Sequence, residues 1–414
     1  MNNLNFLVDV LKDSPVFKTL EKNVKPGRTV CASGLSTINK SNIIYALCRL
    51  KGVTAFCLAS DEKEAQTLCN DLSCMGLRAY VYPVRDFNFL DFQSRSHEYE
   101  HARLKVLLKL INHECDVAIA CVDAAAQLTV PKNVLEQSVI EFEEGRELSL
   151  EKATKALTLL GYERFDAVEG SGQFSLRGGI LDFFMPDSDY PVRCEFWGDE
   201  ITDLSYFDIE TQRRFKKADK ITLSPSTEIV IEDRAALADK IEHKAKLLRS
   251  KNSAKAKEKL FSEAELIRSG AMIANADKFI NQIYDKPESL FDYLDRNTLV
   301  FASEFTAIQE RGKSMDFISN ETLMQGFEDG TLCRGFDRFA LTFNECTEFL
   351  QSHGTIVLEN FVHGSMPIKL SEIISFSTKQ LSAWGGSYKQ LKEDVDGLFT
   401  PESKGVIFAG TERA

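Results

Sequence analysis

The chain has 414 residues, of which 43% are hydrophobic and 27% charged, and its formal net charge is −12 at pH 7. This length predicts about two to four globular domains. The acidic balance excludes a surface that grips nucleic acid along its whole extent, although local basic stretches stay open. No apolar run approaches the roughly 20 residues that a membrane-spanning helix needs, so we expect a cytoplasmic protein without a membrane partner.

Ten cysteines are spread along the chain. No two of them form a C-x-x-C pair and most lie inside apolar runs, so we expect reduced core residues and no zinc site. His97 and His101 are four residues apart, but no third ligand is placed to complete a metalloprotease pattern. The sequence therefore predicts neither a metal nor a cofactor in this chain.

Short apolar runs alternate with helical stretches in the first part of the chain. The apolar runs are 28–33, 53–60, 79–84 and 116–123, and the helical stretches are 41–51, 61–76 and 101–112. Such alternation predicts a parallel sheet covered by helices, the architecture of nucleotide-binding domains. We expect residues 1–135 to form the first part of a doubly wound α/β domain.

The pattern changes near Pro131. A short helical stretch at 150–162 is followed by closely spaced strands, separated by turn signals, at 172–186, 191–201 and 202–213. Hairpin-linked strands of this kind predict an antiparallel sheet. We expect residues 136–225 to form an inserted α+β domain.

The rest of the chain divides into two parts. Helical patterns dominate 226–325 and close on the strand 297–303, so we expect this segment to complete the first domain. Strand and helix alternate again from 335 to 414, which predicts a small, variable α/β domain. Because the last residues follow the strand 405–410 where a helix would begin, we expect a truncated end and further sequence beyond it.

The segment from Gly34 to Ser41 is nearly a phosphate-binding loop, G-x-x-x-x-G-K-[ST]. Lys40 and Ser41 keep their places, but Asn39 replaces the second glycine and adds a side chain where a phosphate must approach. No Asp–Glu pair follows an apolar strand at the place of a Walker B acid, where the apolar run 116–123 offers only Asp123. We predict a degenerate P-loop that serves as a strand-to-helix turn, with a residual ATP site as the alternative.

Three ordered stretches carry a resemblance to a known family. They are R-G-G-I-L-D-F-F at 177–184, P-V-R-C-E-F-W-G-D-E at 191–200 and S-Y-F-D-I-E-T-Q-R at 205–213. Together with the degenerate loop, they resemble the N-terminal, UvrB-like region of the bacterial transcription-repair coupling factors. The same stretch is similar to the excision-repair subunit UvrB, but UvrB keeps an intact phosphate loop and has a longer aromatic hairpin than residues 85–101 provide.

The resemblance implies a degenerate, helicase-like module whose inserted domain recruits the repair protein UvrA to a stalled RNA polymerase. It implies that this chain is no enzyme. The complete protein would be an ATP-dependent DNA translocase that uses Mg²⁺ and reaches RNA polymerase and double-stranded DNA through other domains. The alternative is a UvrB-like helicase subunit that binds ATP and DNA directly. Arg85, Arg95 and Arg103 flank a loop that could touch DNA, although a structural role for Arg103 on its helix is favoured.

Strand 191–197 predicts a binding face. Arg193, Glu195 and Trp197 share one side of it, and the apolar residues between them share the other. Trp and Arg anchor many protein interfaces. By the resemblance, Arg177, Arg193 and Trp197 match two arginines and an aromatic, usually Phe, that bind UvrA. We expect Glu195 to orient Arg193. Reversing the charge of Arg177 or Arg193 should abolish UvrA binding without unfolding the domain. The alternative is that these are exposed strand residues held only by local salt bridges.

Overall fold

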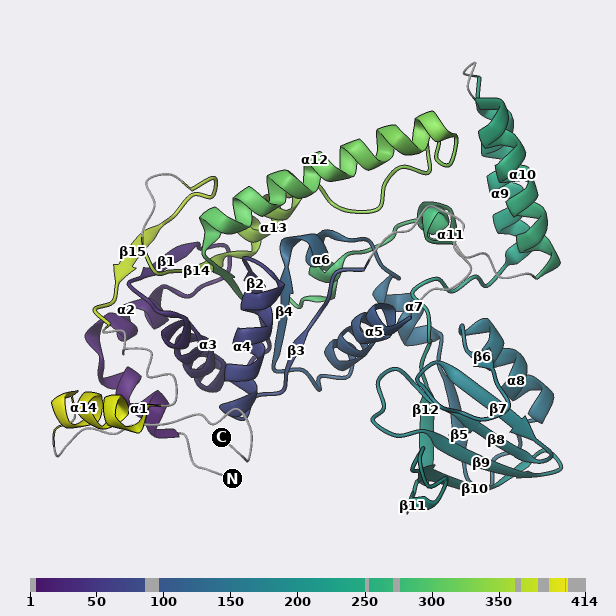
Figure 1. Cartoon of the computed structure of the whole chain (residues 1–414), viewed down its shortest axis with the longest axis horizontal. Coiled ribbons are helices and arrows are strands. Elements are labelled where there is room, and N and C mark those ends of the chain that lie inside the picture. Colours follow the sequence, from purple (N-terminus) through teal and green to yellow (C-terminus); the bar gives the residue numbers. More distant parts are fainter. Residues whose placement is uncertain are drawn as a thin grey trace.

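A seven-stranded parallel sheet forms the centre of the molecule (Figure 1). The computed structural model describes residues 5–85, 97–249, 253–270, 276–361, 366–378, 387–398 and 400. The strand order is β15-β1-β14-β13-β2-β4-β3. The strands are β1 (Val30–Ser33), β2 (Ala55–Ala59), β3 (Ala79–Val81), β4 (Val117–Cys121), β13 (Leu299–Ser303), β14 (Thr355–Glu359) and β15 (Glu372–Ser375). The predicted parallel α/β architecture is confirmed.

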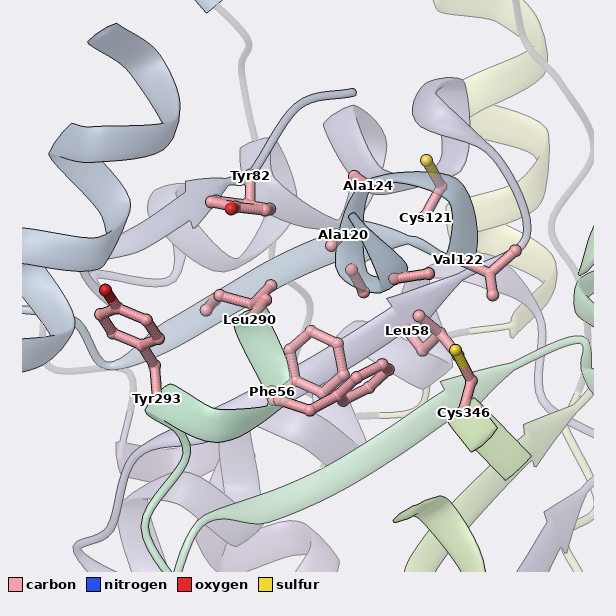
Figure 2. Packing of buried hydrophobic residues seen from close by; sticks show 14 of the residues in the cluster. Phe56, Leu58, Tyr82, Ala120, Cys121, Val122, Ala124, Leu290, Tyr293 and Cys346 are labelled. Carbon is pink, nitrogen blue, oxygen red and sulfur yellow. The ribbon is translucent and has the colours of Figure 1, made fainter. Parts of the chain in front are cut away.

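Helices cover both faces of this sheet. One face packs against α1 (Asn5–Asp13), α2 (Pro15–Asn23), α3 (Thr37–Lys51) and α4 (Glu62–Cys74). The other packs against α5 (Glu98–Ile111), α6 (Val122–Ala126), α7 (Lys132–Gln137), η2 (Leu290–Tyr293), α12 (Phe305–Asp329) and α13 (Phe343–His353). Figure 2 shows the second core, where Phe56 of β2 lies near Leu290 and Leu58 of β2 lies near Cys346. Strands buried on both sides are apolar throughout, as parallel strands require.

The expectation of a separate domain at 335–414 is wrong for its described strands. β14 lies between β1 and β13, and β15 pairs with β1. Ile356 packs into the core on one face of the first sheet and Val357 into the core on the other. A strand that is apolar on both sides is most stable between two neighbours, so β14 becomes a central strand. The last helix is α14 (Tyr388–Leu398), and the strand expected at 405–410 lies outside the described residues.

Residues 140–223 have a hydrophobic core of their own. They form a six-stranded sheet in the order β11-β10-β9-β8-β7-β6 and a two-stranded sheet of β5 with β12. The elements are β5 (Ile140–Glu143), α8 (Leu150–Leu159), β6 (Glu163–Arg164), β7 (Gln173–Arg177), β8 (Ile180–Phe183), β9 (Val192–Trp197), β10 (Glu200–Phe207), β11 (Arg214–Lys217) and β12 (Lys220–Leu223). Helix α8 and the β5–β12 pair cover one face of the larger sheet.

A helical hairpin occupies much of the segment expected to complete the first domain. It consists of α9 (Arg234–Leu247) and α10 (Ser253–Ser269), which pack together with η1 (Ala276–Phe279) around a small separate core. Helix α11 (Ile280–Ile283) follows η1. In Figure 1 this hairpin extends away from the parallel sheet, whereas β13 is a strand of the sheet and α12 packs against it. Residues 226–325 therefore divide between the small core of the hairpin and the two cores of the parallel sheet.

Buried charges join these parts. Arg103 on α5 is fully buried, stacks 4.2 Å from the Tyr82 ring centre and donates to Glu228 over 2.6 Å. Arg85 is also buried and is paired with Asp277 from η1. Because Glu228 lies just after the inserted domain, the network ties the insertion and the helical hairpin to the first domain. Arg85 and Arg103 are thus unavailable to DNA, and Arg95 lies outside the described residues.

Candidate functional site

The outer face of the six-stranded sheet carries the residues expected to bind a partner. Along β9, Val192, Cys194 and Phe196 are buried in the domain core, whereas Arg193 and Trp197 point the other way. The predicted alternation is therefore confirmed. The side chains between the core residues are left for other contacts.

A single buried carboxylate holds the two arginines together. Asp182 on β8 faces Arg193 on β9 in register. Arg193 Nε donates to Asp182 Oδ1 over 2.7 Å, and Nη2 donates to Oδ2 over 2.8 Å. Arg177 Nη2 donates to the same Oδ2 over 3.3 Å. The Asp182 side chain is only 1% exposed, so both guanidinium groups compensate one charge that water cannot reach.

Arg193 is fixed on its remaining sides as well. Its guanidinium carbon lies 4.4 Å from the Phe207 ring centre, and its nitrogens donate to the Gln212 carbonyl and side-chain oxygens over 3.2 and 3.1 Å. Gln212 itself has a φ of 57°, which L residues seldom adopt. The hydrogen bonds to Asp182 raise the pKa of Arg193 above its usual value. Only 13% of the Arg193 side chain is exposed. It is a framework residue more than a contact residue.

Trp197 and Arg177 are the accessible members of the trio. Trp197 is 82% exposed at the end of β9, and the Arg177 side chain is 55% exposed at the end of β7. Arg177 pairs with Ile180, which pairs with Glu195 two residues before Trp197. The register that the sequence left open thus places both side chains at one end of the same face.

Glu195 does not orient Arg193, contrary to expectation. It forms an ion pair with Arg214 of β11, which also binds Asp203 over 2.8 Å. Asp182 performs the expected role instead. The signal was a charged residue inside the apolar run I-L-D-F-F, which had to find a partner because a lone buried carboxylate is costly.

The two glycines before β8 serve the domain's own backbone. Gly178 has a φ of 62° in the turn between β7 and β8. A Cβ on Gly179 would lie 2.7 Å from the carbonyl oxygen of Phe196, so this glycine allows close approach of β9. The geometry of the hairpin therefore accounts for both glycines, and the close approach of a partner's backbone is not needed to explain them.

Lys40, in the segment predicted to be a degenerate phosphate loop, is surrounded by side chains of the same protein. Lys40 Nζ donates to Glu304 Oε1 over 2.6 Å and to Ser303 Oγ over 2.9 Å, and lies 3.4 Å from Glu64 Oε1. Only 4% of the Lys40 side chain is exposed. Carboxylates thus occupy the positions around the amine that phosphate oxygens take in a working loop.

The other loop residues also have internal partners. Asn39 donates to Ser36 Oγ over 2.8 Å, and Ser41 donates to Asp71 Oδ2 over 2.9 Å. Gly34 has a φ of 79°, and a Cβ there would lie 2.1 Å from the Phe376 carbonyl oxygen. The hydroxyl that would hold Mg²⁺ is therefore committed to a carboxylate of α4.

The acid beside Lys40 follows β13 and not β4. Asp123, after β4, pairs with Arg311 over 2.9 Å and does not approach Lys40. Glu304 directly follows β13, two strands from β1 in the sheet. Only the strand order brings it to the loop, so no local pattern could reveal it. Beside it, burial followed by the charge of Glu304 raises the pKa of Glu359 to about 7.

Across the described part of the chain, no group of three or more His, Cys, Asp or Glu side chains could hold a metal ion. Nor is any described helix both long enough and apolar enough to span a bilayer. All ten cysteines are free, and Cys74 alone among them is exposed.

Residues 140–229 match the sequence family of the UvrB interaction domain. Over 97% of its length the chain is 26% identical to the transcription-repair-coupling factor of Bacillus subtilis strain 168. The chain is thus similar in sequence to these coupling factors. It is 25% identical to that of Staphylococcus epidermidis RP62A over 80% of this chain, and 21% identical to that of Staphylococcus aureus USA300 over 99%.

These comparisons confirm the resemblance read from the sequence. The chain spans 35% of the Bacillus and Staphylococcus aureus relatives and 29% of the Staphylococcus epidermidis relative. Arg177, Arg193 and Trp197 all lie inside the UvrB interaction domain. The outer face of the six-stranded sheet therefore lies within the segment that matches the UvrB interaction domain.

Proposed function

We propose that this chain is a docking module that recruits the repair protein UvrA through the outer face of its UvrB interaction domain. The observation that carries the proposal is the match at 140–229, which contains the exposed Trp197 and Arg177. In the complete protein this module would deliver UvrA to a stalled RNA polymerase. ATP-driven movement on double-stranded DNA would belong to regions beyond this chain.

The face divides into contact and framework. Trp197 and Arg177 offer a large apolar plate and a cation that lie open to a partner, the residue types that dominate interface energies. Arg193, Asp182 and Phe207 lie beneath and hold the surface rigid. A rigid face loses less side-chain entropy when the partner binds.

We also propose that the first domain is a degenerate, helicase-like P-loop domain without ATP turnover. Its support is the Lys40 amine, which already has Glu304, Ser303 and Glu64 as partners. A nucleotide would have to displace partly buried carboxylates and would bring phosphate charge next to them. Such displacement disfavours binding.

Calorimetric titration of UvrA with the chain tests the docking proposal. We expect Trp197→Ala to weaken binding by at least about 2 kcal/mol, roughly thirtyfold, as for an interface anchor. Leu159→Ala is the matched control, because it removes a 51% exposed apolar side chain from α8, on the covered side of the sheet. Equal affinities for the wild type and the Trp197 variant would exclude this face as the docking surface.

A further inference from the structure

A row of basic residues, six of them Lys or Arg, lies along the edge of the parallel sheet where its strands begin. Taken in strand order, the row comprises Lys25 and Arg28 before β1, His353 before β14, Arg296 before β13, Arg49 and Lys51 before β2, His113 before β4 and Arg78 before β3. These residues line two cavities of about 460 and 220 Å³. The cavities share Val53, Asn297 and Thr298, so they form one continuous groove. We call it the amino-edge groove.

The amino-edge groove keeps a positive excess in a chain whose net charge is −12. Two of its cations are paired, Arg28 with Glu372 over 3.3 Å and Arg78 with Asp116 over 2.7 Å. Within the ranges that the structure describes, Lys25, Lys51 and Arg296 form no ion pair. The remaining acid that lines the groove, Asp295, lies 3.7 Å from Lys132.

Ordinary structural roles account for only some of these charges. Arg49 and Lys51 are in the last turn of α3, where cations balance the helix dipole. Arg49 also donates to the Gly76 carbonyl oxygen over 2.9 Å. Lys25 and Arg296 lie in loops outside any helix, and both are exposed. Their convergence on one groove calls for an anionic partner.

We propose that the amino-edge groove binds the phosphate backbone of duplex DNA. Five strand steps separate β1 from β3, and at about 4.8 Å a step the row is about 24 Å long. That length corresponds to about seven base pairs at a rise of about 3.4 Å each. A row of charge at this spacing follows a backbone and reads no sequence, because phosphate contacts carry no base information.

The composition of the groove favours DNA over an acidic protein segment. Protein interfaces concentrate energy in aromatic and apolar anchors. The exposed large hydrophobic residues of the described chain, among them Trp197, Phe317 and Phe361, all lie outside the groove lining. Between its basic residues the groove presents small or polar residues such as Gly52 and Thr54 beside aliphatic ones such as Leu77, and among the described residues its lining contains no Phe, Tyr or Trp.

The binding should be weak alone and sensitive to salt. About three or four phosphate contacts predict a slope of log affinity against log salt of about −3 to −4, since each contributes about −0.9. In the complete protein such a patch would guide DNA that other regions hold. The groove lies at the edge opposite the phosphate loop and apart from the UvrA-docking face, so the two proposals stand independently.

Fluorescence anisotropy of the 414-residue chain with a labelled duplex of about 24 base pairs, from about 50 to 200 mM salt, tests the proposal. The test variant carries Lys51→Glu and Arg296→Glu. The control variant carries Lys152→Glu and Lys313→Glu, which make the same charge change at exposed positions on α8 and α12. All four side chains are exposed, and thermal unfolding checks that every variant folds.

We expect the test variant to lose at least about tenfold in duplex affinity at low salt and to lower the salt slope by about 2, while the control changes neither by much. The proposal fails if the wild type does not bind the duplex at low salt, or if the two variants bind it equally. It also fails if polyglutamate of matched charge binds more tightly than the duplex, which would assign the groove to an acidic protein. UvrA affinity should be the same in both variants, whichever result is obtained.

Discussion

Asp182 and Arg193 meet across β8 and β9 through two hydrogen bonds of 2.7 and 2.8 Å, and the carboxylate of Asp182 also accepts from Arg177. The carboxylate is buried, whereas Arg177 reaches the surface. The orientation of Arg177 and Arg193 is therefore set from beneath the face. No contact between Asp182 and the partner is needed for this effect.

Asp182→Asn should therefore weaken both folding and docking. Loss of the charge leaves Arg193 with no ionised partner in a mostly buried site, and we expect the free energy of unfolding to fall by about 2 kcal/mol. Urea denaturation measures this change, and titration with UvrA measures the effect on docking. Asp203→Asn is the control, because its partner Arg214 is more exposed and such pairs contribute less than about 1 kcal/mol. Equal losses in the two variants would contradict the framework role.

The two docking arginines should respond differently to charge reversal. Arg177→Glu changes a half-exposed side chain and keeps the Arg193–Asp182 pair, so we expect a folded domain that no longer binds UvrA. Arg193→Glu places a second carboxylate beside the buried Asp182, and we expect at least about 3 kcal/mol of destabilisation. This revises the expectation that either reversal would spare the fold. Circular dichroism and thermal unfolding of the two variants separate the cases.

The hairpin glycines should differ as well. Gly179→Ala brings a methyl group to 2.7 Å from the Phe196 carbonyl, so the hairpin must shift, at a cost of about 1–3 kcal/mol. Gly178 has open space around it and needs only a positive φ, which Asn tolerates. Gly178→Asn should therefore change the denaturation midpoint little. A neutral Gly179→Ala would refute the close approach of β9.

The side chains paired with Lys40 should prevent nucleotide binding at Gly34 to Ser41. We expect the wild type to show no saturable ATP binding in calorimetry. Lys40→Met should lower the free energy of unfolding by about 2–3 kcal/mol, because Glu304 and Glu64 lose their shared cation. ATP binding that disappears in the Lys40 variant would instead restore the UvrB-like alternative.

The raised pKa of Glu359 predicts that the stability of the folded state depends on pH. Its pKa is raised from 4.5 to about 7, mainly by burial, so the folded state holds this proton more tightly than the unfolded state. The group therefore lowers stability progressively as pH rises from 4.5 to 7. Glu359→Gln removes this contribution. The variant should gain stability relative to the wild type across this window in urea denaturation, and a constant difference between the two would contradict the shift.

Local patterns predicted the parts of this fold that are local. The alternation of apolar runs and helical stretches predicted β1, β2, β3 and β4, and the period of two along β9 predicted which side chains enter the core. The order of strands is a non-local property. Residues 355–359 read as a strand in sequence, yet only packing shows that they separate β1 from β13.

The same limit applies to the candidate site. Trp197 and Arg177 could be selected from composition and resemblance, but the register that sets them on one end of the face depends on three paired strands. Glu304 could not be linked to Lys40, because the two are separated by 264 positions and meet only through the sheet. The position of Asp182 inside an apolar run indicated that it needs a charged partner, but the sequence did not show that this partner is Arg193.

The outer face of the six-stranded sheet carries three arginines, Arg177, Arg193 and Arg214, and the three carboxylates that pair with them. Because these six charges cancel, this cluster itself adds little long-range attraction for a partner. Encounter with that partner should then proceed at an ordinary diffusional rate that ionic strength barely changes. Selectivity would arise after contact, in how long the complex persists.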